Sequence, residues 1–264
     1  MNVVILLAGI VDPKSPLQTL SLGSDGVVVG EDTLPRVLSP FDEAALEIAL
    51  QLRDAEPAVK ITAFVLGGAH SEQLLRIVAA FRLDGVFGVD CRPTHRWDVP
   101  QLARILKDAL DATQAWPVLA LIGREFGDCD DGALPPFLAE AWGWRFAGLA
   151  QEVVRTGKDL MFRRARGDVD EWLTLPLPAI ASVTNDKSNR LRYPLLKNVM
   201  AAKQATFTAI SPRDPAAPPR LSPSAVKLSA PTRGERPACR MLAGSVENQV
   251  AELTGFLRHW RGVP

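Results

Sequence analysis

Continuous apolar runs alternate with amphipathic helical stripes over the first 142 residues, and this alternation limits the possible folds more than any other feature of the chain. The runs are rich in Val, Ile, Leu, Ala and Phe, and each is short. Short runs of this kind are typical of strands buried on both faces of a parallel sheet. The predicted strands are 3–7, 60–66, 86–89 and 118–122.

Helical stripes fill the intervals between these strands. The clearest begins at Ser39, a good N-cap residue, followed by Pro40 at the first helical position and by Asp42 and Glu43 near the positive end of the helix dipole. Further helices are predicted from residue 71, from residue 98 and up to about residue 142. This order predicts an α/β fold, with a mostly parallel sheet covered by helices on both faces.

The pattern changes after residue 150, where shorter strands lie around glycine turns and a short helix follows them. The expected elements are strands 151–154, 160–164, 171–175 and 179–183 and a helix over 194–203. We therefore place an α/β domain of the nucleotide-binding type over residues 1–204.

Residues 205–264 differ in kind from this domain. Seven prolines fall within the 33 residues 205–237, and so much proline opposes both helices and strand ladders. Ser245 then precedes a helical stripe with apolar residues at 246, 250, 253, 257 and 260. An extended arm that ends in an amphipathic helix needs a surface to cover. We expect that surface to belong to a partner subunit, with the chain's own domain as the alternative.

Charge and cysteine content exclude several classes of protein. Lys+Arg is 30 and Asp+Glu is 30, and a net charge of zero argues against nucleic-acid binding. The three cysteines lie far apart, which favours a reducing compartment. The longest apolar run, 3–11, is well short of the ~20 residues that span a bilayer. We expect a cytoplasmic protein that does not insert into membranes.

Standard catalytic and phosphate-binding motifs are absent from the sequence, among them G-x-x-x-x-G-K-[ST], G-x-G-x-x-G and H-E-x-x-H. The three histidines, His70, His95 and His259, are scattered, so a nucleophilic triad is not expected. We expect surface histidines, no catalytic residues and no metal site.

The loop from Gly123 to Leu134 is the most informative local feature. It follows a predicted buried strand and precedes a helix, and ligands of open α/β sheets bind outside the carboxyl ends of the strands. Its glycines allow close approach of a ligand, and a helix N-terminus can receive a phosphate. Two alternatives remain. In the first, Asp128, Asp130 and Asp131 bind a hard cation, although they lack the ligand spacing of a calcium loop. In the second, the loop is a solvated acidic segment that caps the following helix.

Three blocks of the sequence resemble the β subunit of electron transfer flavoprotein. They occur in one order over nearly the whole chain. The first block is Ser39-Pro40-Phe41-Asp42-Glu43-Ala44-Ala45-Leu46-Glu47. The second runs from Gly123-Arg124 through Asp128 and Asp130 to Gly143-Trp144. The third runs from Arg163 to Lys203 and ends in Arg192-Tyr193-x-x-Leu196-x-Asn198-Val199-Met200-x-Ala202-Lys203.

The resemblance implies an adenine-nucleotide α-hydrolase-like fold and half of a heterodimeric electron carrier, not an enzyme. In that family the α subunit holds most of the FAD and the β subunit binds AMP. A recognition loop docks onto flavin dehydrogenases, and electrons pass on toward a quinone-reducing acceptor. The AMP site falls on Ser39, Pro40, Phe41, Asp42, Gly123, Arg124, Asp128, Asp130 and Gly132. The docking residues fall on Arg192, Tyr193, Leu196, Asn198, Met200 and Lys203, with Leu196 as the exposed anchor.

Several alternatives stay open at this point. Plain N-capping is the alternative for Ser39 to Asp42, and core burial is the alternative for Leu196. The sequence departs from the family at Ser39, at Ala8-Gly9 and at Asp131, which adds negative charge near a phosphate. Three alternatives therefore stay open for the nucleotide site: AMP, a second FAD and no nucleotide. A function of another class is a stand-alone protein that binds or hydrolyses an adenine nucleotide.

Overall fold

The structure is a computed structural model that describes residues 1–15, 34–67, 71–91, 98–113, 116–127, 132–213 and 239–260. The chain divides into two compact units, 1–224 and 225–264. His70, His95 and residues 214–238 of the predicted arm lie outside the described residues. Within the described residues, no helix combines the length and the apolar character that crossing a bilayer requires.

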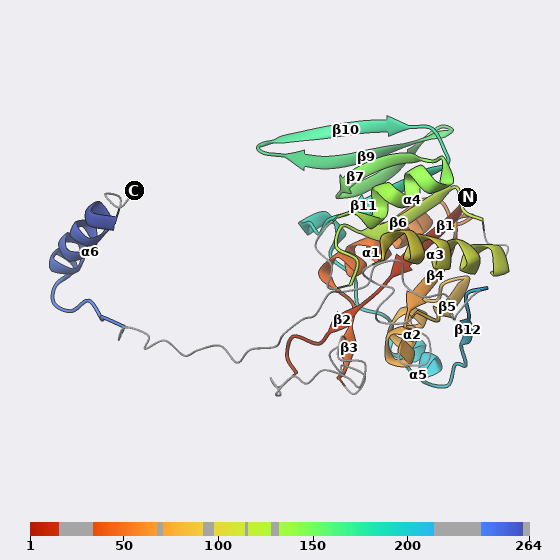
Figure 1. Cartoon of the computed structure of the whole chain (residues 1–264), viewed down its shortest axis with the longest axis horizontal. Coiled ribbons are helices and arrows are strands. Elements are labelled where there is room, and N and C mark those ends of the chain that lie inside the picture. Colours follow the sequence, from red (N-terminus) through yellow and green to blue (C-terminus); the bar gives the residue numbers. More distant parts are fainter. Residues whose placement is uncertain are drawn as a thin grey trace. The chain divides into compact units, whose positions relative to one another are not determined.

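A seven-stranded sheet forms the centre of the first unit (Figure 1). Its order is β12-β5-β4-β1-β6-β11-β7, and every strand pair in it is parallel. The α/β prediction with a mostly parallel sheet is thus confirmed. The strands are β1 (Asn2–Leu7), β4 (Lys60–Leu66), β5 (Gly85–Val89), β6 (Leu119–Gly123), β7 (Arg145–Ala150), β11 (Ala179–Val183) and β12 (Thr208–Ile210).

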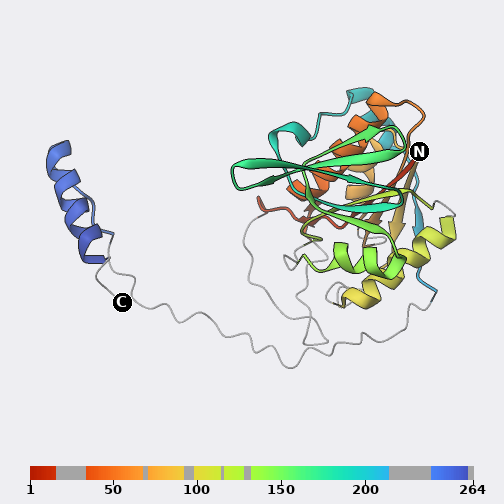
Figure 2. The same ribbon diagram turned by 90° about the horizontal axis from the view of Figure 1, so that it is seen from above.

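Helices cover both faces of this sheet (Figure 2). One face carries α1 (Pro40–Ala55) and α2 (Glu72–Ala79), and α5 (Leu196–Lys203) lies against α2. The other face carries α3 (Val99–Thr113) and α4 (Leu134–Trp142).

The central strand β1 shows how the sequence builds two cores at once. Side chains of a strand point alternately to opposite faces. Val3, Ile5 and Leu7 accordingly join the core under α1 and α2, whereas Val4 and Leu6 join the core under α3 and α4. All five side chains are buried, which confirms the prediction of a strand covered on both faces.

A smaller antiparallel sheet extends the α1 side of the unit. It has the order β10-β9-β8 and shares the α1 core through Val153, Leu160 and Phe162. Its strands are β8 (Glu152–Thr156), β9 (Asp159–Arg166) and β10 (Val169–Leu175). The remaining short elements of the unit are the strand pair β2 (Ile10–Val11) and β3 (Arg36–Val37) and the 3-10 turn η3 (Lys187–Asn189).

Two edge strands of the main sheet were not expected from the sequence. β7 reads Arg-Phe-Ala-Gly-Leu-Ala, which is not a continuous branched run, and its pairing with β11 has a register shift. β12 pairs with β5, so the sheet continues beyond residue 204 and residues 208–210 are not part of an unstructured arm. These residues precede Pro212, the first proline of the arm, so no proline opposes strand pairing there.

The second unit contains the predicted C-terminal helix, α6 (Val246–Trp260). None of its described residues is buried. Its large apolar side chains are all exposed, namely Val246, Val250, Leu253, Phe256, Leu257 and Trp260.

Candidate functional site

The predicted nucleotide residues from different blocks meet at the carboxyl ends of β1 and β6. The chain runs from β1 to β4 and β5 on one side and then crosses to β6 on the other, so the strand order reverses between β1 and β6. Ligands of open α/β sheets bind at such a reversal. Gly9 follows β1, Gly123 ends β6, and Ser39 precedes α1 beside them.

Asp42 fixes this edge from inside. The Ser39 hydroxyl accepts a hydrogen bond from the Asp42 backbone N–H at 3.0 Å, and the Asp42 carboxylate accepts one from the Ser39 N–H at 3.1 Å. The same carboxylate oxygen accepts a bond from the Gly9 N–H at 3.0 Å. Asp42 and Ser39 are both buried. The capping interpretation is therefore confirmed, and the ligand role of these two side chains stays a prediction.

Burial also changes the acidity of Asp42. Removal of the carboxyl group from water raises its pKa, and the hydrogen bonds from Ser39 and Gly9 oppose this shift. Among the described residues, its Oδ1 atom has no hydrogen-bond partner.

Phe41, Gly123 and Arg124 pack together at the start of α1. The Arg124 guanidinium lies 4.8 Å from the centre of the Phe41 ring, a cation–π distance. Its Nη2 also donates to the Glu125 carboxylate at 2.8 Å. A Cβ atom on Gly123 would lie 2.9 Å from the Phe41 Cβ, so a glycine is required for this loop to approach the helix.

Arg36 is a residue of this edge that sequence reasoning missed. Its Nη2 donates to the Gly9 carbonyl oxygen at 3.1 Å. It lies in the two-residue strand β3, which pairs with β2 just after β1. A lone arginine before a helix gives no signal of this position, because β2–β3 pairing is too short to read from a pattern.

The glycine at position 9 also has a structural reason. Its φ is +64°, a backbone conformation that favours glycine, and a Cβ there would lie 2.4 Å from Leu74 Cδ1 in α2. The departure from the family at Ala8-Gly9 is thus tied to the packing of α2. Arg36 and Arg124 supply guanidinium groups near this edge.

The described residues fit an anionic ligand only in part. The two guanidinium groups suit a phosphate, and the Asp42 charge is turned inward. Asp128, Asp130 and Asp131, together with Cys129, lie outside the described residues. Gly132 is exposed, with a φ of +61° and no heavy atom within 4 Å of a built Cβ. Pro40 is exposed at the first turn of α1.

The predicted docking residues form a second, separate region. We call residues 192–203 the docking segment. Tyr193 is 91 % exposed and Leu196 is 75 % exposed, and Leu195 and Met200 are exposed beside them. Asn198 is half-buried and Lys203 is exposed. Burial of Ala202 holds α5 in place. Core burial, the alternative for Leu196, is therefore wrong.

Arg192 behaves differently from its neighbours in this segment. Its guanidinium turns toward α1, where Nη2 donates to Glu47 at 2.7 Å and Nη1 donates to Asp54 at 2.5 Å. The paired carboxylates hold the pKa of Arg192 above its usual value. Arg192 was predicted among the docking side chains. In the structure its guanidinium instead binds two carboxylates of α1.

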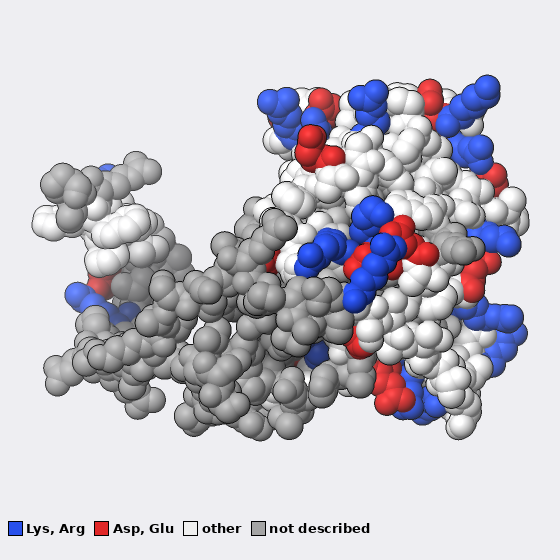
Figure 3. Space-filling view, turned by 45° about the vertical axis from the view of Figure 1, so that its right-hand side comes forward, with Lys and Arg blue, Asp and Glu red and all other residues white. Residues whose placement is uncertain are grey.

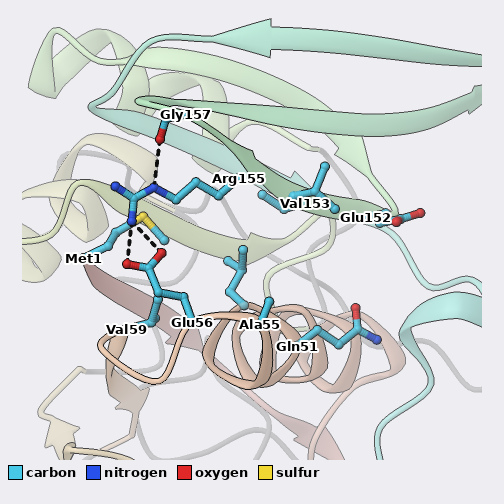
Figure 4. Close-up of a pocket in the computed structure, with 11 residues that line it drawn as sticks. Met1, Gln51, Ala55, Glu56, Val59, Glu152, Val153, Arg155 and Gly157 are labelled. Carbon is cyan, nitrogen blue, oxygen red and sulfur yellow. Dashed lines mark hydrogen bonds and ion pairs between the residues drawn. The ribbon is translucent and has the colours of Figure 1, made fainter.

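One open cavity of about 590 Å³ lies away from both regions (Figure 4). The last turn of α1 and strand β8 form its walls, and Arg155 donates to Glu56 across it at 2.7 Å. Met1 and Val59, which stand just before β1 and β4, place it at the amino ends of the strands. Ligands of this architecture bind at the opposite ends, so the cavity is not the predicted nucleotide site.

Surface charges are mixed on the face shown in Figure 3. Lysine and arginine side chains are interspersed with aspartate and glutamate among the described residues of this face. This distribution agrees with the equal numbers of basic and acidic residues in the chain.

Comparison with known proteins decides the family. The model of the electron transfer flavoprotein domain matches residues 26–215. The chain belongs to the electron transfer flavoprotein family. The match includes all three blocks that the sequence analysis singled out, so the suspected resemblance is confirmed.

Curated relatives extend the electron transfer flavoprotein match to the whole chain. The β subunit of electron transfer flavoprotein from Bradyrhizobium diazoefficiens is 28 % identical over 265 residues, covering 100 % of each chain. The mitochondrial β subunit from Oryza sativa subsp. indica is 29 % identical over 84 % of this chain and 85 % of its own. The human β subunit is 29 % identical over 72 % of this chain and 73 % of its own.

Proposed function

We propose that this chain is the β subunit of a heterodimeric electron transfer flavoprotein. Electrons from flavin dehydrogenases pass to FAD, which the α subunit holds in the main, and then toward a quinone-reducing acceptor. The flavin supplies the redox chemistry. This chain holds the α subunit, shapes the flavin environment and recognises the dehydrogenase, so it is a carrier subunit and not an enzyme. A cytoplasmic location, favoured by the scattered cysteines, is part of the same proposal.

The exposed tip of the docking segment carries this proposal. The large apolar side chains of this tip are exposed to solvent in α5 and in the residues just before it, namely Tyr193, Leu195, Leu196 and Met200. Contiguous apolar surface of this kind marks a site of protein–protein interaction. A small apolar contact suits the short-lived docking that fast electron exchange requires.

The amphipathic helix α6 supports the heterodimer. Its apolar residues recur at helical spacing and are exposed within their own unit. We propose that this stripe packs on the α subunit, as expected of the predicted arm.

We call the edge formed by Gly9, Gly123 and the first turn of α1 the nucleotide edge. We propose that it binds AMP without direct contact from Ser39 or Asp42. Arg124 and Arg36 would face the phosphate, and Phe41 and Pro40 would line the approach. Asp128, Asp130 and Gly132 belong to the same proposed site through the family resemblance.

Co-expression with an α subunit tests the proposal. We expect a yellow heterodimer that is reduced by a flavin dehydrogenase, and a colourless product when this chain is expressed alone. A chain that accepts no electrons in either form would contradict the proposal.

The role of Leu196 is tested by Leu196→Ala in that heterodimer. We expect the KM for the dehydrogenase to rise about tenfold or more, because an anchor residue contributes about 2 kcal/mol or more to binding, while FAD content stays constant. Val169→Ala is the matched control. Val169 is also exposed, but it begins β10, which lies far from α5 (Figure 1). An unchanged KM for Leu196→Ala would remove the docking role.

A further inference from the structure

The connection between β11 and α5 passes along α1 and is hydrogen-bonded to it at Ser188 and at Arg192. Gln51 Nε2 donates to the Ser188 carbonyl oxygen at 2.7 Å. Asn189, which is buried, donates through its side chain to the Gln151 and Thr184 carbonyl oxygens. The chain that leads into the docking segment is therefore held in a defined path before it reaches Arg192.

Arg192 is the last fastening point before the exposed tip. The Glu47 carboxylate accepts bonds from the Arg192 backbone N–H at 3.1 Å, from Nε at 3.0 Å and from Nη2 at 2.7 Å. Glu47 is only 4 % exposed. A buried carboxylate needs such partners, and a bidentate guanidinium fixes direction as well as distance. Asp54, two turns further along α1, holds the remaining Nη1.

The tip begins immediately after this pair. Tyr193 follows Arg192 directly, and Leu195 and Leu196 come within four residues. Without a fixed start, a short segment with several apolar side chains would sample many conformations, and ordering it on binding would weaken the complex. The ion pair removes that freedom in advance.

We propose that Glu47, with Asp54, is a positioning residue for dehydrogenase recognition, because it holds Arg192 and thereby presents Tyr193 and Leu196 in their binding conformation. This inference rests on the proposed function. It reassigns Arg192 from a contact with the partner to an anchor within the chain.

The test uses the purified heterodimer and the flavin dehydrogenase that reduces the wild type. In Glu47→Gln, we expect the KM for that dehydrogenase to rise about tenfold, the change that follows when one or two side chains must be ordered on binding. The rate at saturating dehydrogenase, the FAD content and the rate of reduction by dithionite should stay constant. Asp54→Asn, at an exposed position, should give a smaller rise and serves if Glu47→Gln fails to fold.

The matched control is Glu56→Gln. Glu56 follows the last turn of α1 and, like Glu47, binds an arginine, Arg155, but it does so at the cavity and not at the docking segment. We expect no change in KM. A rise for Glu56→Gln equal to that for Glu47→Gln would show a general loss of stability and would overturn the inference.

Amide hydrogen exchange at Arg192, whose backbone N–H donates to Glu47, gives a second readout that needs no dehydrogenase. We expect faster exchange there in Glu47→Gln and unchanged exchange in Glu56→Gln. If the wild-type heterodimer accepts no electrons, the proposed function fails, and the exchange result still decides whether Glu47 orders the segment. If the wild type works and Glu47→Gln keeps both its KM and its slow exchange, the inference alone is overturned.

Discussion

At the scale of single residues, two carboxylates of this chain accept hydrogen bonds from its own backbone. Asp42 binds the N–H groups of Gly9 and Ser39, and Asp186 binds the N–H of Ser188. Asp42 thereby joins the end of β1 to the start of α1, and Asp186 closes the turn at η3. Both positions therefore make predictions about stability rather than about ligand affinity.

Asp42→Ala should destabilise the unit by about 1–3 kcal/mol, because it leaves two buried N–H donors without an acceptor. The free energy of unfolding, measured in urea, tests this. Asp42→Asn should lose less, since an amide oxygen can still accept both bonds. Equal stability of Asp42→Ala and the wild type would contradict the prediction.

The lowered pKa of Asp186 makes the stability of the folded chain depend on pH in the acid range. Hydrogen bonds from the Ser188 N–H and hydroxyl, together with the Arg163 guanidinium, lower the pKa of this carboxyl from 3.8 to about 2. As pH falls below about 4, the unfolded chain takes up this proton before the folded chain does, so stability falls until about pH 2. Asp186→Asn should be less stable at neutral pH and should show a shallower decline over this window in thermal unfolding. Parallel curves would exclude a role for Asp186.

At the scale of elements, α1 connects the two candidate regions. Its first turn, capped by Ser39, forms one side of the nucleotide edge. Its polar face, through Glu47 and Asp54, holds the start of the docking segment. The helix signal was clear from the capping residues and the stripe, but the sequence did not show that its polar positions serve the docking segment, because the partners are about 140 residues apart.

The exposed stripe of α6 makes a prediction at the same scale. Leu253→Asp places a charge in the apolar stripe and should weaken the heterodimer by about 10- to 100-fold in Kd, because burying an unpaired charge at an interface is unfavourable. Ala251→Asp, on the opposite side of the helix, is the matched control. Size-exclusion chromatography over a dilution series measures the Kd. Equal effects of the two changes would mean that the stripe is not an interface.

At the scale of the whole molecule, the sequence predicted the layers better than the edges. The four buried strands and the helices between them carry strong patterns, so they were found. β7 and β12 are held chiefly by pairing with β11 and β5, a long-range term that local pattern does not contain. Likewise, the exposed Leu196 was expected through the resemblance, whereas Arg36 near Gly9 depended on a strand pair of two residues.

The nucleotide site makes a prediction for the assembled protein. Mass spectrometry of the denatured heterodimer should recover AMP in a one-to-one ratio with the chain. Arg124→Ala should lower this ratio, because it removes a guanidinium near the phosphate position. Recovery of no nucleotide, or of a second FAD, from the wild type would contradict the AMP proposal.

After α5 the chain returns to the domain before the arm begins. β12 hydrogen-bonds along β5, and Arg213 then pairs with Asp108 and Asp111 on α3. The docking segment is consequently held on both sides, by Arg192 at its start and by β12 and Arg213 after its end. A force exerted through the C-terminal arm would be taken up at β12 and α3, so the proposed packing of α6 on the α subunit would leave the proposed docking of Leu196 undisturbed.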